Sequence, residues 1–134
     1  PGVHALDLRD GGTVWQALAP LDTCVDRKFC IPGYSQAITV TPELVFAGSG
    51  DGWFRVLDAD SGALLWQIDT TRSVRTVSGT MAAGGSMSGG AAPLAHAGML
   101  FVSSGYGFGP QMPGNLLLAF ELSPVELPSP AAKH

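Results

Sequence analysis

Two stretches of this sequence repeat at a fixed offset of 51 residues, and this repeat constrains the fold more than any other feature. The first stretch, VHALDLRDGGTVWQ, spans residues 3–16, and the second, FRVLDADSGALLWQ, spans residues 54–67. A looser copy follows, in which MLFVSSG at 99–105 resembles LVFAGSG at 44–50. A period of this size, made of strand-like segments, is typical of a β-propeller or another array of blade-like sheets.

The segment 37–69 contains one complete unit of this repeat and predicts a four-stranded antiparallel blade. Its strands are expected at 37–40, 44–49, 53–58 and 63–69. Asp51-Gly52 and Asp60-Ser61-Gly62 are turn signals, because glycine adopts the positive φ values of tight turns and aspartate accepts backbone hydrogen bonds there. The chain also has 18 glycines and 10 prolines, which suits short strands joined by turns.

The residues that repeat are expected to have structural roles. They are Trp15 and Trp66, Asp7 and Asp58, and Gly11 and Gly62. Each tryptophan would bury its ring between neighbouring blades and find a partner for its N–H group. Each aspartate and glycine would form the turn that precedes the tryptophan strand.

We predict an all-β fold in which residues 1–122 are a C-terminal fragment of a propeller, two to three blades long. The blade parts are 1–20, 37–69 and 91–122, and residues 123–134 form a Pro-rich tail that we expect to be poorly ordered. The last blade has no Trp-bearing fourth strand. We expect that strand to come from an N-terminal region that precedes this chain, because pairing removes an open sheet edge. The absence of an initiator Met and of a signal peptide also suggests a fragment or a processed piece.

Composition excludes several classes of partner and of protein. Hydrophobic residues make up 46% and charged residues 13%, which excludes disorder over most of the length. The net charge is −4 and the seven Lys and Arg form no basic run, which argues against nucleic acid as a partner. No apolar stretch reaches the roughly 18 residues of a membrane-spanning helix.

Cys24 and Cys30 are the only cysteines, with five residues between them. A disulfide is the favoured interpretation if the compartment is oxidising. Free structural thiols are one alternative. A metal or redox site is another, but it would need further ligands, and no histidine lies near in sequence.

Three stretches of the sequence resemble a known protein family. AGSGDGWFRVLDADSGALLWQ at 47–67 resembles the tryptophan-docking repeat of pyrroloquinoline quinone (PQQ) propellers. The stretch 84–122, with its SGYG and MPGN–LLAF runs, is similar to the C-terminal segment of polyvinyl-alcohol-dehydrogenase-like quinoproteins. The stretch CVDRKFCIPGYSQAITVTPELVFAGSGDG at 24–52 fits the same subgroup.

The resemblance implies an eight-bladed propeller, exported to the periplasm, with PQQ near its central axis and usually a calcium ion. The implied reaction is the oxidation of an alcohol, with electrons passed to a cytochrome c. The N-terminal features of such enzymes, namely the calcium ligands, the catalytic carboxylate region and a haem motif, are missing here. We therefore expect no catalytic residue and no metal ligand in this chain, and no activity or measurable PQQ binding by this chain alone.

Eight residues are the candidates for the wall of the cofactor site, and each has a structural alternative. They are Tyr34, Ser35, Arg72, Ser86, Met87, Gly89, Gly90 and Tyr106. Tyr34 and Tyr106 are flat aromatic side chains in loops that the resemblance places near the cofactor or the substrate entrance, and the alternative is packing within those loops. An arginine can pair with a carboxylate of PQQ, whereas most arginines are solvated on the surface. The small residues of GGSMSGG let the backbone approach a ligand, whereas the same composition also suits a flexible linker.

The sequence is also compatible with two other interpretations of what this chain does. The same repeat also occurs in propellers without a cofactor that serve as binding or assembly scaffolds, and the chain could be the product of a truncated, nonfunctional reading frame. In every case, open sheet faces at both ends of a partial propeller predict aggregation or dimerisation of the isolated chain.

Overall fold

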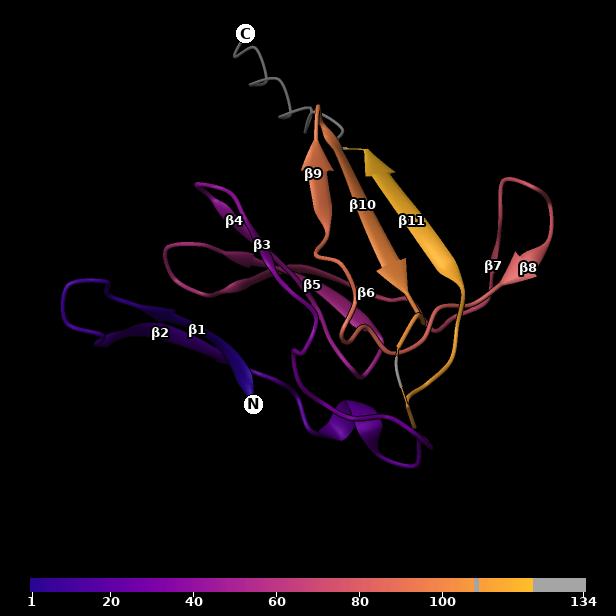
Figure 1. Ribbon diagram of the computed structural model, residues 1–134, viewed down its shortest axis with the longest axis horizontal. Helices are drawn as coiled ribbons and strands as arrows, with labels where there is room; N and C mark the ends of the chain where they lie inside the picture. The colour runs from indigo at the N-terminus through magenta and orange to yellow at the C-terminus, as the bar shows by residue number, and fades with distance from the viewer. Residues whose placement is uncertain (108, 122–134) are drawn as a thin grey trace, which may run out of the picture.

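The computed structural model describes residues 1–107 and 109–121, and within them the fold is built almost entirely from β-strands (Figure 1). The predicted tail at 123–134, together with Phe108 and Leu122, lies outside the described residues. The strands are β1 (Gly2–Leu6), β2 (Thr13–Leu18), β3 (Thr39–Val40), β4 (Leu44–Gly48), β5 (Trp53–Asp58), β6 (Leu64–Asp69), β7 (Val74–Arg75), β8 (Met81–Ala82), β9 (Leu94–His96), β10 (Met99–Ser104) and β11 (Leu116–Glu121). One 3-10 helix, η1, spans Asp22–Cys24.

Strands β3 to β6 form the four-stranded antiparallel sheet that the sequence predicts, in chain order. The first strand is shorter than the predicted 37–40, because it pairs only through Thr39 and Val40. The residues before it pair with the connection that leads into β9. The side-chain amide of Gln36 donates to the carbonyl of Ala91, and Ser35 forms an isolated parallel β-bridge with Ser88. The start of this strand is therefore fixed by contacts with another part of the chain.

The two hairpins that carry the sequence repeat have the same geometry. In β1–β2, Ala5 is opposite Trp15 and the register then shifts by one residue; in β5–β6, Val56 is opposite Trp66 and the same shift follows. Gly11 has φ +74° and Gly62 has φ +72°, and each donates its N–H to the carbonyl of the aspartate four residues before it. The repeated turn residues thus produce the same turn twice.

Alternation along the central sheet gives it two apolar faces. Val45, Ala47 and Leu57 pack with Val3 and Trp15 of the β1–β2 hairpin. On the opposite face Phe46, Phe54, Val56, Leu100 and Val102 form a second core, which joins this sheet to the three-stranded sheet β9–β10–β11. Figure 1 shows these three sheets side by side, with the β3–β6 sheet between the β1–β2 hairpin and the β9–β11 sheet.

Part of the connection between β6 and β9 packs into the interior, which differs from the solvent-exposed linker that its composition left open as an alternative. The connection contains the short hairpin β7–β8, and residues 84–88 are buried between the sheets. Gly84 and Gly85 have to be glycine, because a Cβ atom would lie 2.3 Å from the Ser104 hydroxyl at the first position and 2.2 Å from the Met112 carbonyl at the second. Small residues here allow close packing of backbone on backbone.

Candidate functional site

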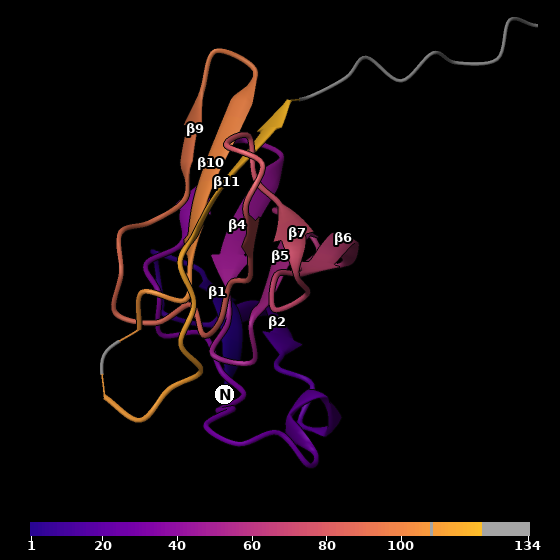
Figure 2. The ribbon, with the colours of Figure 1, turned by 90° about the vertical axis from the view of Figure 1, so that its right-hand side faces the viewer.

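Four segments meet at one end of the sheets. They are the two connections that lead into β3 and β9, and the two loops that follow β4 and β10 (Figure 2). The backbone N–H of Gly50 donates to the carbonyl of Gly33 at 2.8 Å, which fastens the first connection to the loop after β4. The N–H of Ser86 donates to the carbonyl of Met112 at 2.9 Å, which fastens the second connection to the loop after β10.

These segments enclose a pocket of about 230 Å³. It is lined by Pro1, Ile31, Gly33, Tyr34, Ser35, Gly50, Ser88 and Gln111. The hydroxyl of Ser88 hydrogen bonds to the side-chain oxygen of Gln111, so the last two residues join the connection before β9 to the loop after β10. The lining thus carries one phenol, two serine hydroxyl groups and one carboxamide.

Two of the predicted cofactor residues line this pocket, and two more lie next to it in the chain. Tyr34 and Ser35 line it, and the N–H of Gly89 donates to the carbonyl of Ser35 at 3.4 Å. Gly90 follows directly and lies beside the carboxamide of Gln36. The fold therefore brings the connection that leads into β3 next to the connection that leads into β9.

The side chains of Ser86 and Met87 are buried in the interior and do not line the pocket. The hydroxyl of Ser86 donates to the carbonyl of Gly50 at 2.7 Å and accepts from the N–H of Met112 at 3.1 Å. Met87 is 1% exposed and belongs to the core between the two larger sheets. These two residues shape the pocket from behind, through the backbone that they hold in place.

Arg72 and Tyr106 have exposed side chains. The side chain of Arg72 is 80% exposed and its Nε lies 3.6 Å from a carboxylate oxygen of Asp69 at the end of β6. The side chain of Tyr106 is exposed, on the loop that also carries Gln111. Neither residue is among those that line the pocket.

Gln111 and Ser88 are pocket residues that the sequence analysis did not single out. Ser88 lies inside the GGSMSGG run and Gln111 lies between the SGYG and MPGN runs, so proximity to these runs was the available signal. Asp51 and Arg55 were missed for a different reason. The Asp51-Gly52 pair reads as an ordinary turn, and the alternating pattern of β5 does not show that Arg55 points inward.

Asp51 and Arg55 form a buried ion pair behind Tyr34. A guanidinium nitrogen of Arg55 lies 2.8 Å from Oδ2 of Asp51, and both side chains are almost fully buried. Oδ1 of Asp51 also accepts the N–H of Trp53 at 2.9 Å, and Oδ2 accepts the hydroxyl of Thr23 at 2.8 Å. Burial by itself would raise the pKa of Asp51, but the hydrogen bonds from Arg55, Trp53 and Thr23 outweigh it and hold that pKa below its ordinary value.

The disulfide between Cys24 and Cys30 is confirmed. The loop that it closes is fastened to the β4–β5 turn, because Arg27 donates to the carbonyl of Asp51 at 3.3 Å and to the hydroxyl of Thr71 at 2.8 Å. Since Ile31, Gly33 and Tyr34 follow the disulfide directly, its position determines where one wall of the pocket lies.

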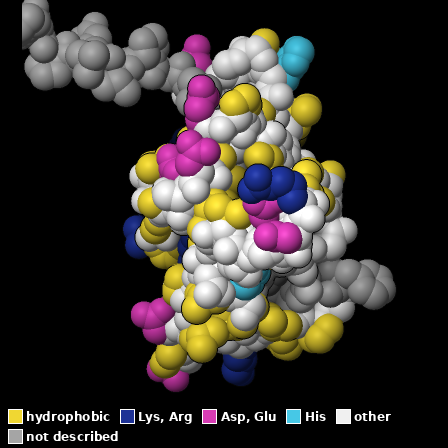
Figure 3. Space-filling view, turned by 90° about the vertical axis from the view of Figure 1, so that its left-hand side faces the viewer, with side chains coloured by type: hydrophobic (Ala, Val, Ile, Leu, Met, Phe, Trp, Pro, Cys, Tyr) yellow, Lys and Arg dark blue, Asp and Glu magenta, His cyan; other side chains and the backbone are white. Residues whose placement is uncertain are grey.

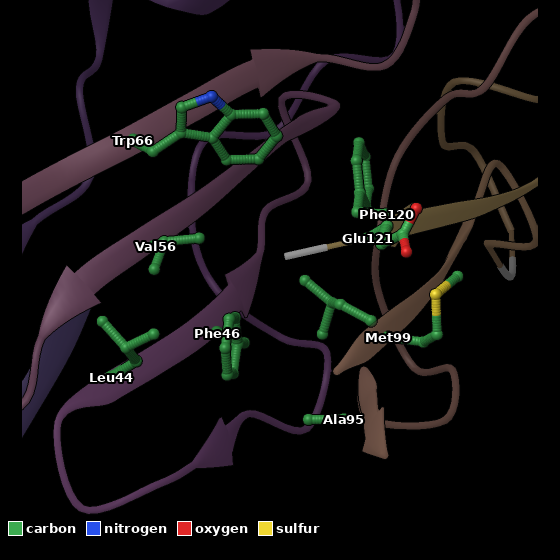
Figure 4. Close-up of a pocket in the computed structure, with 9 residues that line it drawn as sticks. Leu44, Phe46, Val56, Trp66, Ala95, Met99, Phe120 and Glu121 are labelled. Carbon is green, nitrogen blue, oxygen red and sulfur yellow. The ribbon is translucent and has the colours of Figure 1, made fainter. Parts of the chain in front are cut away.

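A second, apolar pocket of about 360 Å³ lies between the β3–β6 and β9–β11 sheets. Figure 4 shows its lining, with Trp66 of β6 beside Phe120 of β11. Their ring centroids are 5.4 Å apart at an interplanar angle of 77°. Trp66 thus reaches the next sheet, as Trp15 does where its indole N–H donates to the carbonyl of Ala59 at 2.9 Å.

Comparison with known proteins identifies the family. Residues 2–121 match the family model PQQ_2, which is described as "Outer membrane protein assembly factor BamB". The chain belongs to the PQQ_2 family. The resemblance to PQQ propellers is thereby confirmed, and the sheets described above are parts of a PQQ-type β-propeller, a partial one with tryptophan-docking repeats.

Among individual relatives, the chain is 43% identical over 132 residues to a polyvinylalcohol dehydrogenase of Pseudomonas sp, covering 91% of this chain and 20% of that protein. It is 45% identical over 109 residues to a polyvinylalcohol dehydrogenase of Sphingopyxis sp. (strain 113P3), covering 79% of this chain and 16% of that protein. It is also 32% identical over 68 residues to a quinoprotein ethanol dehydrogenase of Pseudomonas aeruginosa, covering 51% of this chain and 9% of that protein. The chain therefore spans about a fifth or less of the length of these relatives.

The pocket fits one edge of a flat quinone of the PQQ type. The ring of Tyr34 offers an aromatic face, and the hydroxyl of Ser35 offers a donor for a carboxylate or carbonyl oxygen. The hydroxyl of Ser88 already donates to the side-chain oxygen of Gln111, so the further donor on that side is the NH2 group of the Gln111 carboxamide. No Lys or Arg is among the pocket-lining residues, so the carboxylates of such a ligand meet no cation within the described part of the pocket. Residues 1–107 and 109–121 also hold no cluster of three or more His, Cys, Asp or Glu suited to a metal ion, and no helix long and apolar enough to cross a membrane.

Proposed function

We propose that this chain is the C-terminal part of a PQQ-dependent dehydrogenase that oxidises an alcohol. The observation that carries the proposal is the pocket at the shared end of the two connections, in a chain that matches two polyvinylalcohol dehydrogenases over most of its own length. Since it covers only about a fifth of the first of them, the catalytic groups would belong to the rest of the polypeptide.

In this function Tyr34 would hold one edge of the cofactor by contact with its ring, and Ser35 and Gln111 would do so by donated hydrogen bonds. Ser88 would orient the carboxamide of Gln111. PQQ, when bound, accepts the two electrons that the alcohol loses. Ser86 and Met87 would support this wall from the core. Arg72 would require the loop at the end of β6 to rearrange before it could pair with a carboxylate of the cofactor.

The remaining features of the proposal concern the whole polypeptide. We propose that its N-terminal blades complete the propeller and supply the calcium ligands and the catalytic base, and that a cytochrome c accepts the electrons. We place the protein in the periplasm, because the Cys24–Cys30 disulfide suits an oxidising compartment. The eight-bladed ring and the division into blade parts at 1–20, 37–69 and 91–122 belong to the same proposal.

The second candidate is a scaffold that binds or assembles other proteins and holds no cofactor. The description of the matching family favours it, because that description names an assembly factor. The two functions differ in one measurable property, which is whether the protein binds PQQ.

The test uses the polypeptide encoded by the whole reading frame that contains this chain. After incubation with PQQ and Ca²⁺, we expect alcohol-dependent reduction of an electron-accepting dye, with polyvinyl alcohol and ethanol compared as substrates. The Tyr34→Ala variant should bind PQQ more weakly, whereas Val77→Ala, at a fully exposed position of the β7–β8 hairpin, should behave as the wild type. A whole polypeptide that binds no PQQ in a calorimetric titration would exclude the dehydrogenase and favour the scaffold.

A further inference from the structure

Behind the candidate pocket, the buried side chain of Arg55 lies between two aromatic rings. Its Cζ atom is 5.9 Å from the centroid of Tyr34 and 5.8 Å from the centroid of Trp53. Arg55 itself is 2% exposed and does not line the pocket, whereas Tyr34 does. We propose that Arg55 is a positioning residue, which fixes the ring of Tyr34 as a rigid wall of the pocket. This inference rests on the proposed function and assigns a role that acts through Tyr34.

The guanidinium group is held in one orientation. Two of its nitrogens donate to the two carboxylate oxygens of Asp51, at 3.3 Å and 2.8 Å. A paired fork of this kind fixes the plane of the guanidinium as well as its position. The plane that faces Tyr34 is therefore determined by Asp51.

Asp51 is fixed in turn by groups outside its own strand. Thr23, in the 3-10 helix before the disulfide loop, donates to its carboxylate, and Arg27, within that loop, donates to its carbonyl. Tyr34 is anchored from the other side, because the carbonyl of Gly33 accepts the N–H of Gly50 and the hydroxyl of Ser49. The ring thus lies between a fastened backbone and a fastened cation.

Packing alone does not account for an arginine at this position. Its Nε is buried without a hydrogen-bond partner among the described residues. An apolar side chain of similar size would fill the same space without burying an unpaired N–H group or a charge pair. A cation that faces the ring does something an apolar residue cannot: it attracts the negative face of the Tyr34 π system and fixes the ring's tilt.

The pKa of the Tyr34 phenol, which can be followed by absorbance, reports on the contact with Arg55. Burial raises the pKa of the Tyr34 phenol, and the positive charge of Arg55 partly opposes that rise. Removal of the cation should therefore move the titration of Tyr34 to higher pH. A residue that only filled space would not produce this shift.

The chain has two tyrosines, so the Tyr106→Phe variant of the full 134-residue chain leaves Tyr34 as its only phenol. In that background, tyrosinate absorbance is followed against pH, with far-ultraviolet circular dichroism to verify folding. We expect Arg55→Met to shift the midpoint upward and Arg55→Lys, which keeps the charge, to restore most of it. Arg75→Met, at an exposed arginine of β7, is the matched control and should leave the midpoint unchanged.

Arg55→Met leaves Asp51 as a buried, unpaired carboxylate and could prevent folding. The double variant Asp51→Asn/Arg55→Met removes both charges and keeps the volume. We expect it to raise the midpoint too, because the charge of Arg55 has the larger effect on Tyr34 and that of Asp51 the smaller, opposite one. An unchanged or lowered midpoint in a folded double variant would overturn the inference.

A second measurement separates this inference from the proposed function. In the whole polypeptide, Arg55→Met should weaken PQQ binding by about tenfold, the upper range for ordering one side chain on binding, and Arg55→Lys should weaken it less. Equal PQQ affinity of wild type and Arg55→Met would contradict the positioning role. If the wild-type polypeptide binds no PQQ but the midpoint of Tyr34 shifts as expected, the proposed function fails while the contact between Arg55 and Tyr34 stands.

Discussion

A Cβ atom at Gly62 would lie 2.4 Å from Cε3 of Trp15, which belongs to the neighbouring sheet. The repeat puts a glycine at the equivalent position 11, where a Cβ atom would meet nothing within 4 Å. Gly11 and Gly62 have almost the same φ. The same substitution at both positions therefore compares a turn that contacts a tryptophan ring with one that does not.

This pair predicts different costs for the same substitution. We expect Gly11→Ala to lower the free energy of unfolding by about 1 kcal/mol, through backbone strain at positive φ alone. Gly62→Ala should cost about 2 kcal/mol more, because Trp15 has to move away from its hydrogen bond with Ala59. Urea denaturation of both variants at equal protein concentration measures the difference, and equal costs would show that the docking of Trp15 contributes little.

The Asp51 carboxylate predicts a loss of stability in acid. Its pKa is lowered in the folded chain, so its contribution is present above the unfolded value, about 3.9, and is lost as the pH falls through the lower folded value. We expect the urea midpoint to fall steeply below about pH 4. Asp51→Asn should be less stable at neutral pH and show a shallower acid dependence, whereas Asp60→Asn, at an exposed turn position, should keep the wild-type slope.

Reduction of the Cys24–Cys30 disulfide should destabilise the fold by about 2 kcal/mol, the chain-entropy value for so short a loop. It should also raise hydrogen exchange at Thr23 and at Tyr34, because the loop that anchors Asp51 gains freedom. Urea unfolding with and without dithiothreitol measures the effect. The Cys24→Ser/Cys30→Ser variant is the control and should not respond to the reductant.

Ser104 joins two sheets through a buried hydrogen-bond network. Its hydroxyl lies 2.7 Å from that of Thr70 and accepts the N–H of Gly85 at 3.0 Å. We expect Ser104→Ala to cost about 1–3 kcal/mol, because it leaves these buried groups unpaired. Ser103→Ala, on the opposite face of β10, should cost less than half as much. A similar cost at both positions would contradict the importance of the network.

The uncovered sheet faces predict self-association. Leu8, Leu18 and Leu117 are more than half exposed, and Figure 3 shows hydrophobic side chains spread over the face that the β1–β2 end presents. We expect the 13.8 kDa chain to elute as a dimer or as larger species in size-exclusion chromatography with light scattering. Leu8→Glu/Leu18→Glu should reduce the average mass. A monodisperse wild-type monomer that melts cooperatively would refute this expectation.

Local features of the sequence determined most of the strands and turns. The turn residues before Trp15 and Trp66, the Asp-Gly turn at Asp51 and the alternation along β4 and β5 were sufficient, because each depends on residues that are near neighbours in the chain. They also led to the family, since the same short motifs define its repeat.

Only the tertiary structure decided which side chains are buried and where they point. Residues 84–88 read equally well as a linker and as a ligand loop, and packing between two sheets placed Ser86 and Met87 in the interior. The contact of Arg55 with Tyr34 depends on a disulfide loop, a turn and a strand that meet only after folding. Local periodicity can show that a residue belongs to a strand, but burial of a charge depends on partners from distant parts of the chain.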